Sequence, residues 1–123
     1  MKKCIMISDS FKGTLSSMDI CAIAREVFSQ IFPACELVTL PVADGGEGTT
    51  ACFVEAIGAE AVWVPASGPF GEPITAAYAK KGTLAVIEMA AAAGLPMAGE
   101  RRNPEKTTTY GVGEMIRDAV ERG

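Results

Sequence analysis

The sequence predicts an α/β protein in which a parallel layer of strands and helices is followed by antiparallel strands. Two patterns in its 123 residues support this prediction. Up to about residue 60, unbroken apolar runs alternate with helix-periodic segments, which is typical of parallel strands joined by helical crossovers. Beyond that point the apolar runs are separated by turns too short to contain a helix, so consecutive strands are expected to pair antiparallel.

The first strand and the first helix are indicated close to the N-terminus. The apolar run Cys4–Ile7 predicts a strand over residues 2–8 that is buried on both faces. Ser16 followed by Asp19 forms a weak capping box that starts a helix, and Pro33 ends it. The expected apolar face of this helix consists of Ile20, Ile23, Ala24, Val27, Phe28 and Ile31.

A second strand and a second helix follow in the same order. Residues 37–42 form an apolar run, and residues 49–57 are expected to be helical, with Gly58 as the residue just past the helix end. Strand, helix, strand and helix in this order indicate a parallel sheet.

The second half of the chain has a different rhythm. Short strands are expected over residues 61–64, 74–79 and 84–88, with Gly and Pro turn residues between the first two. An alanine-rich segment begins at Met89, and Thr107–Thr109 leads into a final helix. The expected apolar face of that helix consists of Val112, Met115, Ile116, Ala119 and Val120.

This change of rhythm predicts a domain boundary near residue 63. Residues 1–63 are expected to be the N-terminal part of a parallel α/β domain, and residues 64–123 the beginning of a second α/β domain with antiparallel strands. Two parallel strands make a poor sheet, so we expect further sequence to complete the first domain.

Composition excludes several classes of function. The chain has 11 Lys and Arg residues against 15 Asp and Glu residues, a formal charge of -4, and no histidine. A Ser-His-Asp triad and a His-ligated zinc are therefore excluded, and the absence of a basic run argues against nucleic-acid binding. No apolar stretch is long enough to predict a membrane span or a signal peptide. The four scattered cysteines are expected to be reduced thiols in a cytoplasmic protein.

Two polar loops share one design, because each joins the end of an expected strand to the start of an expected helix. The loop at Asp9–Gly13 offers a carboxylate, a hydroxyl and an ammonium group, and the loop at Asp44–Thr49 offers two carboxylates and three glycines. Ligands of open α/β sheets bind at such positions. Neither loop matches a nucleotide-binding fingerprint, so two solvated turns remain an alternative of equal weight.

Two further segments could carry chemistry. Glu88 lies at the expected end of a buried strand, and such a carboxylate must be exposed, paired or part of a site. Thr107–Tyr110 has more hydroxyl groups than a helix cap needs, and Arg101 and Arg102 lie shortly before it. The alternatives are a strand-end carboxylate facing water for Glu88 and a solvated loop for the threonine segment.

Taken together, these segments resemble those of bacterial glycerate kinases of the first type. The resemblance rests on Ser8–Gly13, Pro41–Thr49, Ser67–Pro69 with Gly71, Ile87–Ala92, Arg102–Pro104 and Thr107–Gly111, in this order along nearly the whole chain. It implies transfer of the γ-phosphoryl group of ATP to D-glycerate with Mg²⁺, and a Rossmann-like domain completed by C-terminal sequence. Members of that family are considerably longer, and a later glycine-rich segment of theirs is absent here. The chain is therefore expected to be the N-terminal portion of such a kinase, inactive without the remainder of the polypeptide.

The resemblance also implies roles for individual residues. Asp9, Asp44 and Glu88 are expected to be catalytic, with Asp44 as the metal ligand. The expected substrate- or phosphate-binding residues are Ser10, Lys12, Gly45, Gly46, Arg102, Thr108 and Thr109. The phosphorylated hydroxyl is left open, although the resemblance favours 2-phosphoglycerate as the product. Two other classes stay open: a non-catalytic α/β module that binds a small anion, and a subunit piece that self-associates through an open sheet edge.

Overall fold

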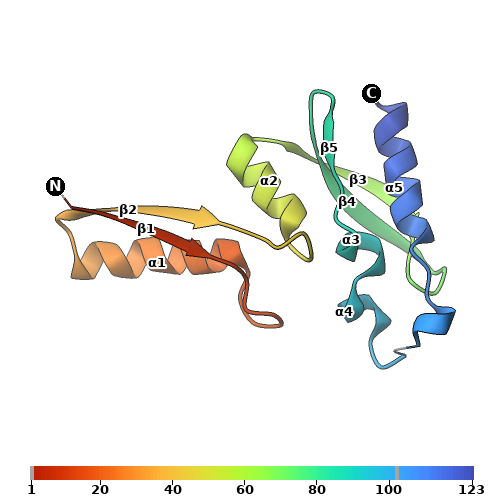
Figure 1. The fold of residues 1–123 in the computed structure, drawn as a ribbon, viewed down its shortest axis with the longest axis horizontal. Helices are drawn as coiled ribbons and strands as arrows, with labels where there is room; N and C mark the ends of the chain where they lie inside the picture. Colours follow the sequence, from red (N-terminus) through yellow and green to blue (C-terminus); the bar gives the residue numbers. More distant parts are fainter. Residues whose placement is uncertain (1, 102) are drawn as a thin grey trace. The chain divides into compact units, whose positions relative to one another are not determined.

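The computed structural model describes residues 2–101 and 103–123, and it has the mixed α/β architecture that the sequence predicts. The chain divides into two compact units, Met1–Asp44 and Gly45–Gly123. The elements in order are β1 (Lys2–Ser8), α1 (Ser17–Ile31), β2 (Cys35–Pro41), α2 (Thr49–Ile57), β3 (Glu60–Ser67), β4 (Pro73–Lys81), β5 (Leu84–Val86), α3 (Ala90–Ala93), α4 (Leu95–Ala98), the 3₁₀ turn η1 (Pro104–Lys106) and α5 (Tyr110–Glu121) (Figure 1). The two units divide after Asp44, whereas the predicted domain boundary at residue 63 concerns a longer protein and stays a prediction.

In the first unit, β1 and β2 pair in parallel and α1 is the crossover between them. The capping box is confirmed: the Asp19 N–H donates to the Ser16 side chain, and the Ser16 N–H donates to the Asp19 carboxylate, both at 3.1 Å. The helix ends just before Pro33, as expected.

The prediction that β1 is buried on both faces is wrong. Ile5 and Ile7 are 58% and 60% exposed, while Cys4 and Met6 on the opposite face are half-buried. The alternation arises because the unit has one helix, α1, which packs against one face of the two strands.

The apolar face expected for α1 is also only partly covered. The most buried residues of α1 are Ser17 and Cys21, which do not belong to that face, whereas Ile23, Val27 and Ile31 of the expected face are exposed. Two strands form a sheet too narrow to cover the whole apolar stripe of a fifteen-residue helix.

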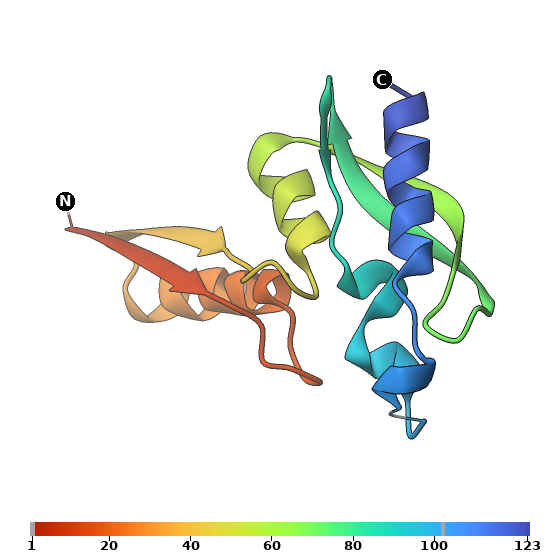
Figure 2. The same cartoon turned by 45° about the vertical axis from the view of Figure 1, so that its right-hand side comes forward.

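In the second unit, β3, β4 and β5 form an antiparallel sheet in that order, which confirms the predicted pairing. The helices α2 and α5 both contact this sheet and lie on opposite sides of it (Figures 1 and 2). Strand β5 ends at Val86, two residues earlier than predicted, so Glu88 lies in the connection to α3.

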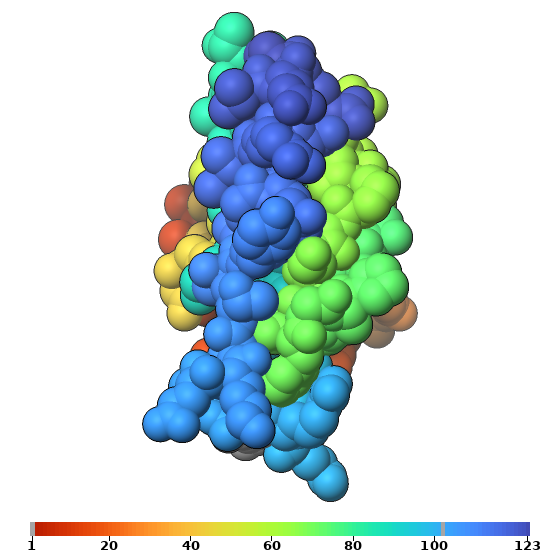
Figure 3. Space-filling view, turned by 90° about the vertical axis from the view of Figure 1, so that its right-hand side faces the viewer, coloured from red at the N-terminus to blue at the C-terminus, as the bar shows by residue number. Residues whose placement is uncertain are grey.

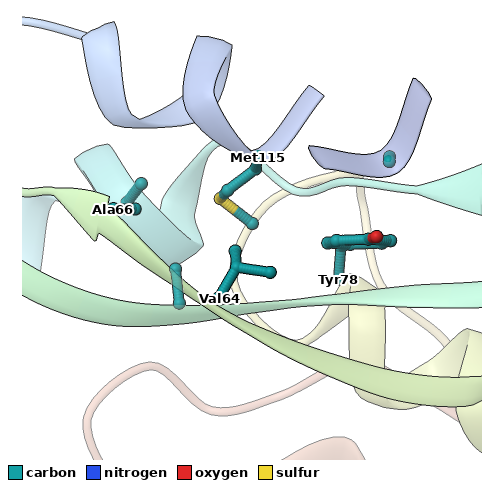
Figure 4. Packing of buried hydrophobic residues seen from close by; sticks show 7 residues of the cluster. Val64, Ala66, Tyr78 and Met115 are labelled. Atoms are coloured by element: carbon teal, nitrogen blue, oxygen red, sulfur yellow. The ribbon is translucent and has the colours of Figure 1, made fainter. Parts of the chain in front are cut away.

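The core of the second unit lies between α5 and the sheet. Met115 points from α5 toward Val64 of β3 and lies near Tyr78 of β4, and all three are almost fully buried (Figure 4). The helix runs along the β3–β4 hairpin (Figure 3). Two residues of its expected apolar face, Ile116 and Val120, are exposed. The buried line passes through the positions just before them, which leaves these two side chains turned about 100° away.

Three smaller predictions can be compared with the described residues. All four cysteines are free thiols, and Cys21 and Cys52 are buried. The helix α2 ends at Gly58 in the left-handed conformation, as expected. Among the helices that the structure describes, each is too short or too polar to cross a bilayer.

Candidate functional site

The residues Gly45–Gly48, here called the glycine loop, form the entry to α2. Gly45 and Gly48 have φ angles of 96° and 91°, in the region where only glycine is unstrained. The Thr49 hydroxyl donates to the Gly46 carbonyl at 2.8 Å, and this bond closes the loop against the first turn of the helix. Gly48 is the N-cap of α2 and has no side chain with which to cap it.

Glu88 supplies the cap that α2 lacks. Its Oε2 accepts the Thr50 N–H at 2.6 Å, and its Oε1 accepts the Gly48 N–H at 3.3 Å. These N–H groups belong to the first turn of a helix, where no intrahelical acceptor exists and where the helix dipole favours a negative charge. Glu88 is buried, with 8% of the residue exposed, so the alternative of a strand-end side chain facing water is wrong. The catalytic role of Glu88 stays a prediction.

The threonine segment before α5 is fixed by hydrogen bonds of its own. The Thr108 N–H donates to the Pro69 carbonyl at 2.9 Å, which ties the segment to the turn between β3 and β4. The Thr108 hydroxyl accepts the N–H of Tyr110, the first residue of α5, at 3.1 Å, whereas the N-cap residue Thr109 makes no side-chain cap bond. The Thr107 hydroxyl donates to the Pro104 carbonyl at 3.3 Å. The segment is therefore ordered by specific contacts, but Thr108, Thr109 and Tyr110 are exposed, so the alternative of a solvated loop stays open.

A cavity of about 620 Å³ lies beside this segment, within the size range of small-molecule sites. Hydroxyl and amide groups line one part of it, and aliphatic side chains line the rest. The lining residues are Pro69, Met89, Ala93, Gly94, Leu95, Ala98, Asn103, Pro104, Thr107, Thr108 and Thr109.

Sequence reasoning placed Thr108 and Thr109 at a binding site but missed Met89, Leu95 and Asn103. Met89 and Asn103 both lie in segments that carried the family resemblance, whereas Leu95 looks like an ordinary core position in the sequence. Arg102 lies outside the described residues. Its neighbour Arg101 stacks its guanidinium on the Phe70 ring, 4.2 Å from the ring centre.

In the first unit, the predicted residues gather where the two parallel strands end. The Val42 N–H donates to the Ser8 carbonyl at 3.4 Å, so the chain segments that lead to Asp9 and Asp44 leave the sheet side by side. The Asp9 carboxylate accepts the Ser10 N–H at 2.7 Å. Lys12 lies in the following turn, which Gly13 completes with a φ of 78°.

The carboxylates at the ends of these strands are the kind of ligand that a hard cation such as Mg²⁺ prefers. Mg²⁺ is usually held by one or two carboxylates together with substrate phosphates, and Asp9 and Asp44 follow neighbouring strand ends of one sheet. Within residues 2–101 and 103–123, no three His, Cys, Asp or Glu side chains come together as a preformed metal site. The metal-binding role of Asp44 stays a prediction.

Glycine-containing polar loops at strand ends and a hydroxyl-lined cavity are features of α/β proteins that bind small molecules. The model of the glycerate kinase family matches residues 4–123. The chain therefore belongs to the glycerate kinase family, and the resemblance read from its motifs is confirmed.

Individual relatives agree with this assignment. The chain is 42% identical to a glycerate kinase of Bacillus subtilis and 42% identical to a glycerate 2-kinase of Escherichia coli, over 98% of its length in each case. The crystal structure of a candidate glycerate kinase 2 from Salmonella typhimurium is 40% identical and superimposes with a TM-score of 0.77 over 98% of the chain. The chain spans about a third of the length of these relatives: 32% of the first two and 34% of the third.

Proposed function

We propose that this chain is part of an ATP-dependent kinase that phosphorylates D-glycerate, with 2-phosphoglycerate as the product. The family match over residues 4–123 is the observation that carries the proposal. The proposed location is the cytoplasm. The proposed partner is the remainder of the polypeptide, because the relatives are about three times as long as this chain.

The proposal assigns the carboxylates of the first unit to the chemistry. Phosphoryl transfer depends on positioning and on neutralising charge more than on covalent help from the protein. Asp9 and Asp44 would hold Mg²⁺ or orient the attacking hydroxyl group of glycerate. Bound Mg²⁺ and ATP supply the phosphoryl group and neutralise its charge. Lys12 lies in the loop Asp9–Gly13. Its ammonium group would bind a phosphate or the glycerate carboxylate.

The proposal assigns binding groups to the second unit. Gly45 and Gly46 precede the capped turn of α2 and would donate backbone N–H groups to an anion. Thr108 and Thr109 line the cavity and would donate hydroxyl hydrogen bonds to a small polar ligand. The guanidinium group of Arg102 would bind the glycerate carboxylate or a phosphate.

The alternative is a non-catalytic α/β module whose glycine loops hold a small anion. The N–H groups of Gly48 and Thr50 already bind the Glu88 carboxylate, so such a module would have to bind the anion through other groups of the loops.

The test uses a chimera in which this chain replaces the matching third of the Bacillus subtilis glycerate kinase. With ATP, Mg²⁺ and D-glycerate we expect ADP formation, and ³¹P spectra should identify 2-phosphoglycerate. Asp44→Ala and Lys12→Ala should each lower turnover about tenfold or more, which corresponds to roughly 1.4 kcal/mol of transition-state stabilisation.

Lys2→Ala is the matched control, because Lys2 is an exposed lysine of β1 at the end opposite to the loops. No ADP formation by the unsubstituted chimera would overturn the proposed activity. Unchanged rates in both loop variants would overturn the assignment of the residues.

A further inference from the structure

We propose that Glu88 is a positioning residue that holds the glycine loop to the wall of the cavity, and that it touches neither substrate nor metal. Its two carboxylate oxygens accept N–H groups at 2.6 and 3.3 Å from the first turn of α2. These contacts bridge 38 and 40 positions of the sequence, so a single side chain ties two distant segments of the second unit together.

The start of α2 needs this carboxylate for a physical reason. The helix has no acidic residue in its first turn and no side-chain cap, because its N-cap is Gly48. Neither the first turn of α2 nor its N-cap residue therefore compensates its first N–H groups and the positive end of its dipole. A buried carboxylate is equally costly without partners, and two charge-assisted hydrogen bonds satisfy both requirements at once.

The main chain of Glu88 reaches the other half of the site. Its carbonyl accepts the Ala91 N–H at 3.2 Å and so takes part in the turn that begins α3. The next residue, Met89, lines the cavity together with Thr108 and Thr109. The Glu88 side chain therefore fixes the position of the glycine loop, while its backbone fixes the start of α3 beside the cavity.

The same geometry argues against direct contact with a ligand. Both carboxylate oxygens are engaged, the residue is 8% exposed, and it is not among the residues that line the cavity. The part of this inference that concerns catalysis rests on the proposed function, whereas the part that concerns the loop does not.

The first experiment measures amide hydrogen exchange in the ¹⁵N-labelled chain. Thr50 N–H has no acceptor within α2, so its protection reports directly on Glu88. We expect Gly48 and Thr50 to be protected in the unsubstituted chain. In Glu88→Gln, which keeps the size but loses the charge and one acceptor, we expect Thr50 to exchange at least about tenfold faster.

The matched control is Glu55→Gln, which removes the same charge from an exposed position of α2 and should leave both amides unchanged. Fast exchange of Thr50 in the unsubstituted chain would overturn the inference without any variant. So would an unchanged Thr50 rate in a folded Glu88→Gln. If Glu88→Gln does not fold, Glu88→Asp keeps the charge on a shorter side chain and is compared in its place.

The second experiment follows catalysis in the chimera described above. If Glu88 is a positioning residue, Glu88→Asp should lose some Thr50 protection and some kcat/KM, and Glu88→Gln should lose more of both. Part of the fall in kcat/KM should come from a higher KM. A large fall in kcat with Thr50 protection unchanged would show that Glu88 acts on substrate or metal, and would overturn the inference. An inactive unsubstituted chimera would instead count against the proposed function and leave the exchange result standing.

Discussion

Gly111, in the first turn of α5, allows that helix to approach the backbone of β3 more closely than any side chain would permit. A Cβ atom at this position would lie 1.9 Å from the Ser67 carbonyl oxygen and 2.9 Å from its carbonyl carbon, although real Cβ contacts essentially never fall below 3.0 Å. Gly111→Ala must therefore separate helix and strand by more than about 1 Å.

The strand cannot yield easily. Ser67 is paired with Pro73 in β4, and its N–H donates to the Glu114 carboxylate on α5 at 2.7 Å. Separation would also loosen the packing of Met115 against the sheet, since a gap of 0.5–1 Å forfeits roughly a quarter to a half of a dispersion contact. Overpacking costs about 1–3 kcal/mol, and we place this substitution at the upper end because backbone meets backbone.

The same helix offers a matched control. Gly113 has open space where its Cβ would be, so Gly113→Ala should gain up to about 1 kcal/mol from helix propensity alone. Both substitutions replace Gly with Ala in α5, and their difference, about 3 kcal/mol, isolates the clash. Urea unfolding followed by circular dichroism and by the fluorescence of Trp63 measures it. A Gly111→Ala variant as stable as Gly113→Ala would refute the reasoning.

Two further predictions concern hydrogen-bonded carboxylates. The buried Tyr78 hydroxyl donates to Asp118 at 2.9 Å, so Tyr78→Phe should lower the free energy of unfolding by about 1.5 kcal/mol in urea. Burial, together with the hydrogen bond to Asp118, raises the pKa of Tyr78. The stability that neutral Tyr78 contributes is therefore complete below its ordinary pKa of about 10 and is lost as pH rises through the raised pKa. If the free energy of unfolding of Tyr78→Phe fell equally steeply at alkaline pH, this reasoning would be contradicted. The side chain and backbone of Ser16 hold the pKa of Asp19 below its ordinary value. Ser16→Ala should raise the pKa of Asp19 in an NMR titration. The stabilisation by ionised Asp19 is present above its ordinary pKa and is lost as pH falls through the lowered pKa. The variant lacks this stabilisation and should therefore lose less stability in acid. An unchanged Asp19 pKa would contradict the capping geometry.

Much of the fold could be predicted because local signals decide it. The capping box at Ser16, the left-handed Gly58 and the short turns between β3, β4 and β5 each act within a few residues, and each was found in the structure. Burial was predicted less well. Ile5 lies in an unbroken apolar run and Val120 has helical periodicity, but both are exposed, because neither pattern shows what covers a face of the strand or helix.

The candidate site shows the same limit. Polar residues of the loops, such as Asp9 and Thr108, could be selected from their types and from their places after strands or before a helix. The partners of Glu88 could not, since nothing near Gly48 or Thr50 in the sequence indicates that their N–H groups are satisfied from about forty positions away. The cavity wall at Met89 and Leu95 depends in the same way on tertiary packing.

Because α2 depends on Glu88, the glycine loop should not keep its conformation when it is transferred alone to another protein. With nine residues, α2 is shorter than the roughly 12–15 residues at which isolated helices become even marginally stable in water. A peptide spanning residues 45–58 would therefore contain the whole glycine loop and α2 but would not hold their folded conformation. Grafting the loop onto another scaffold would require a carboxylate delivered from a second segment, so the transferable unit is the loop together with Glu88.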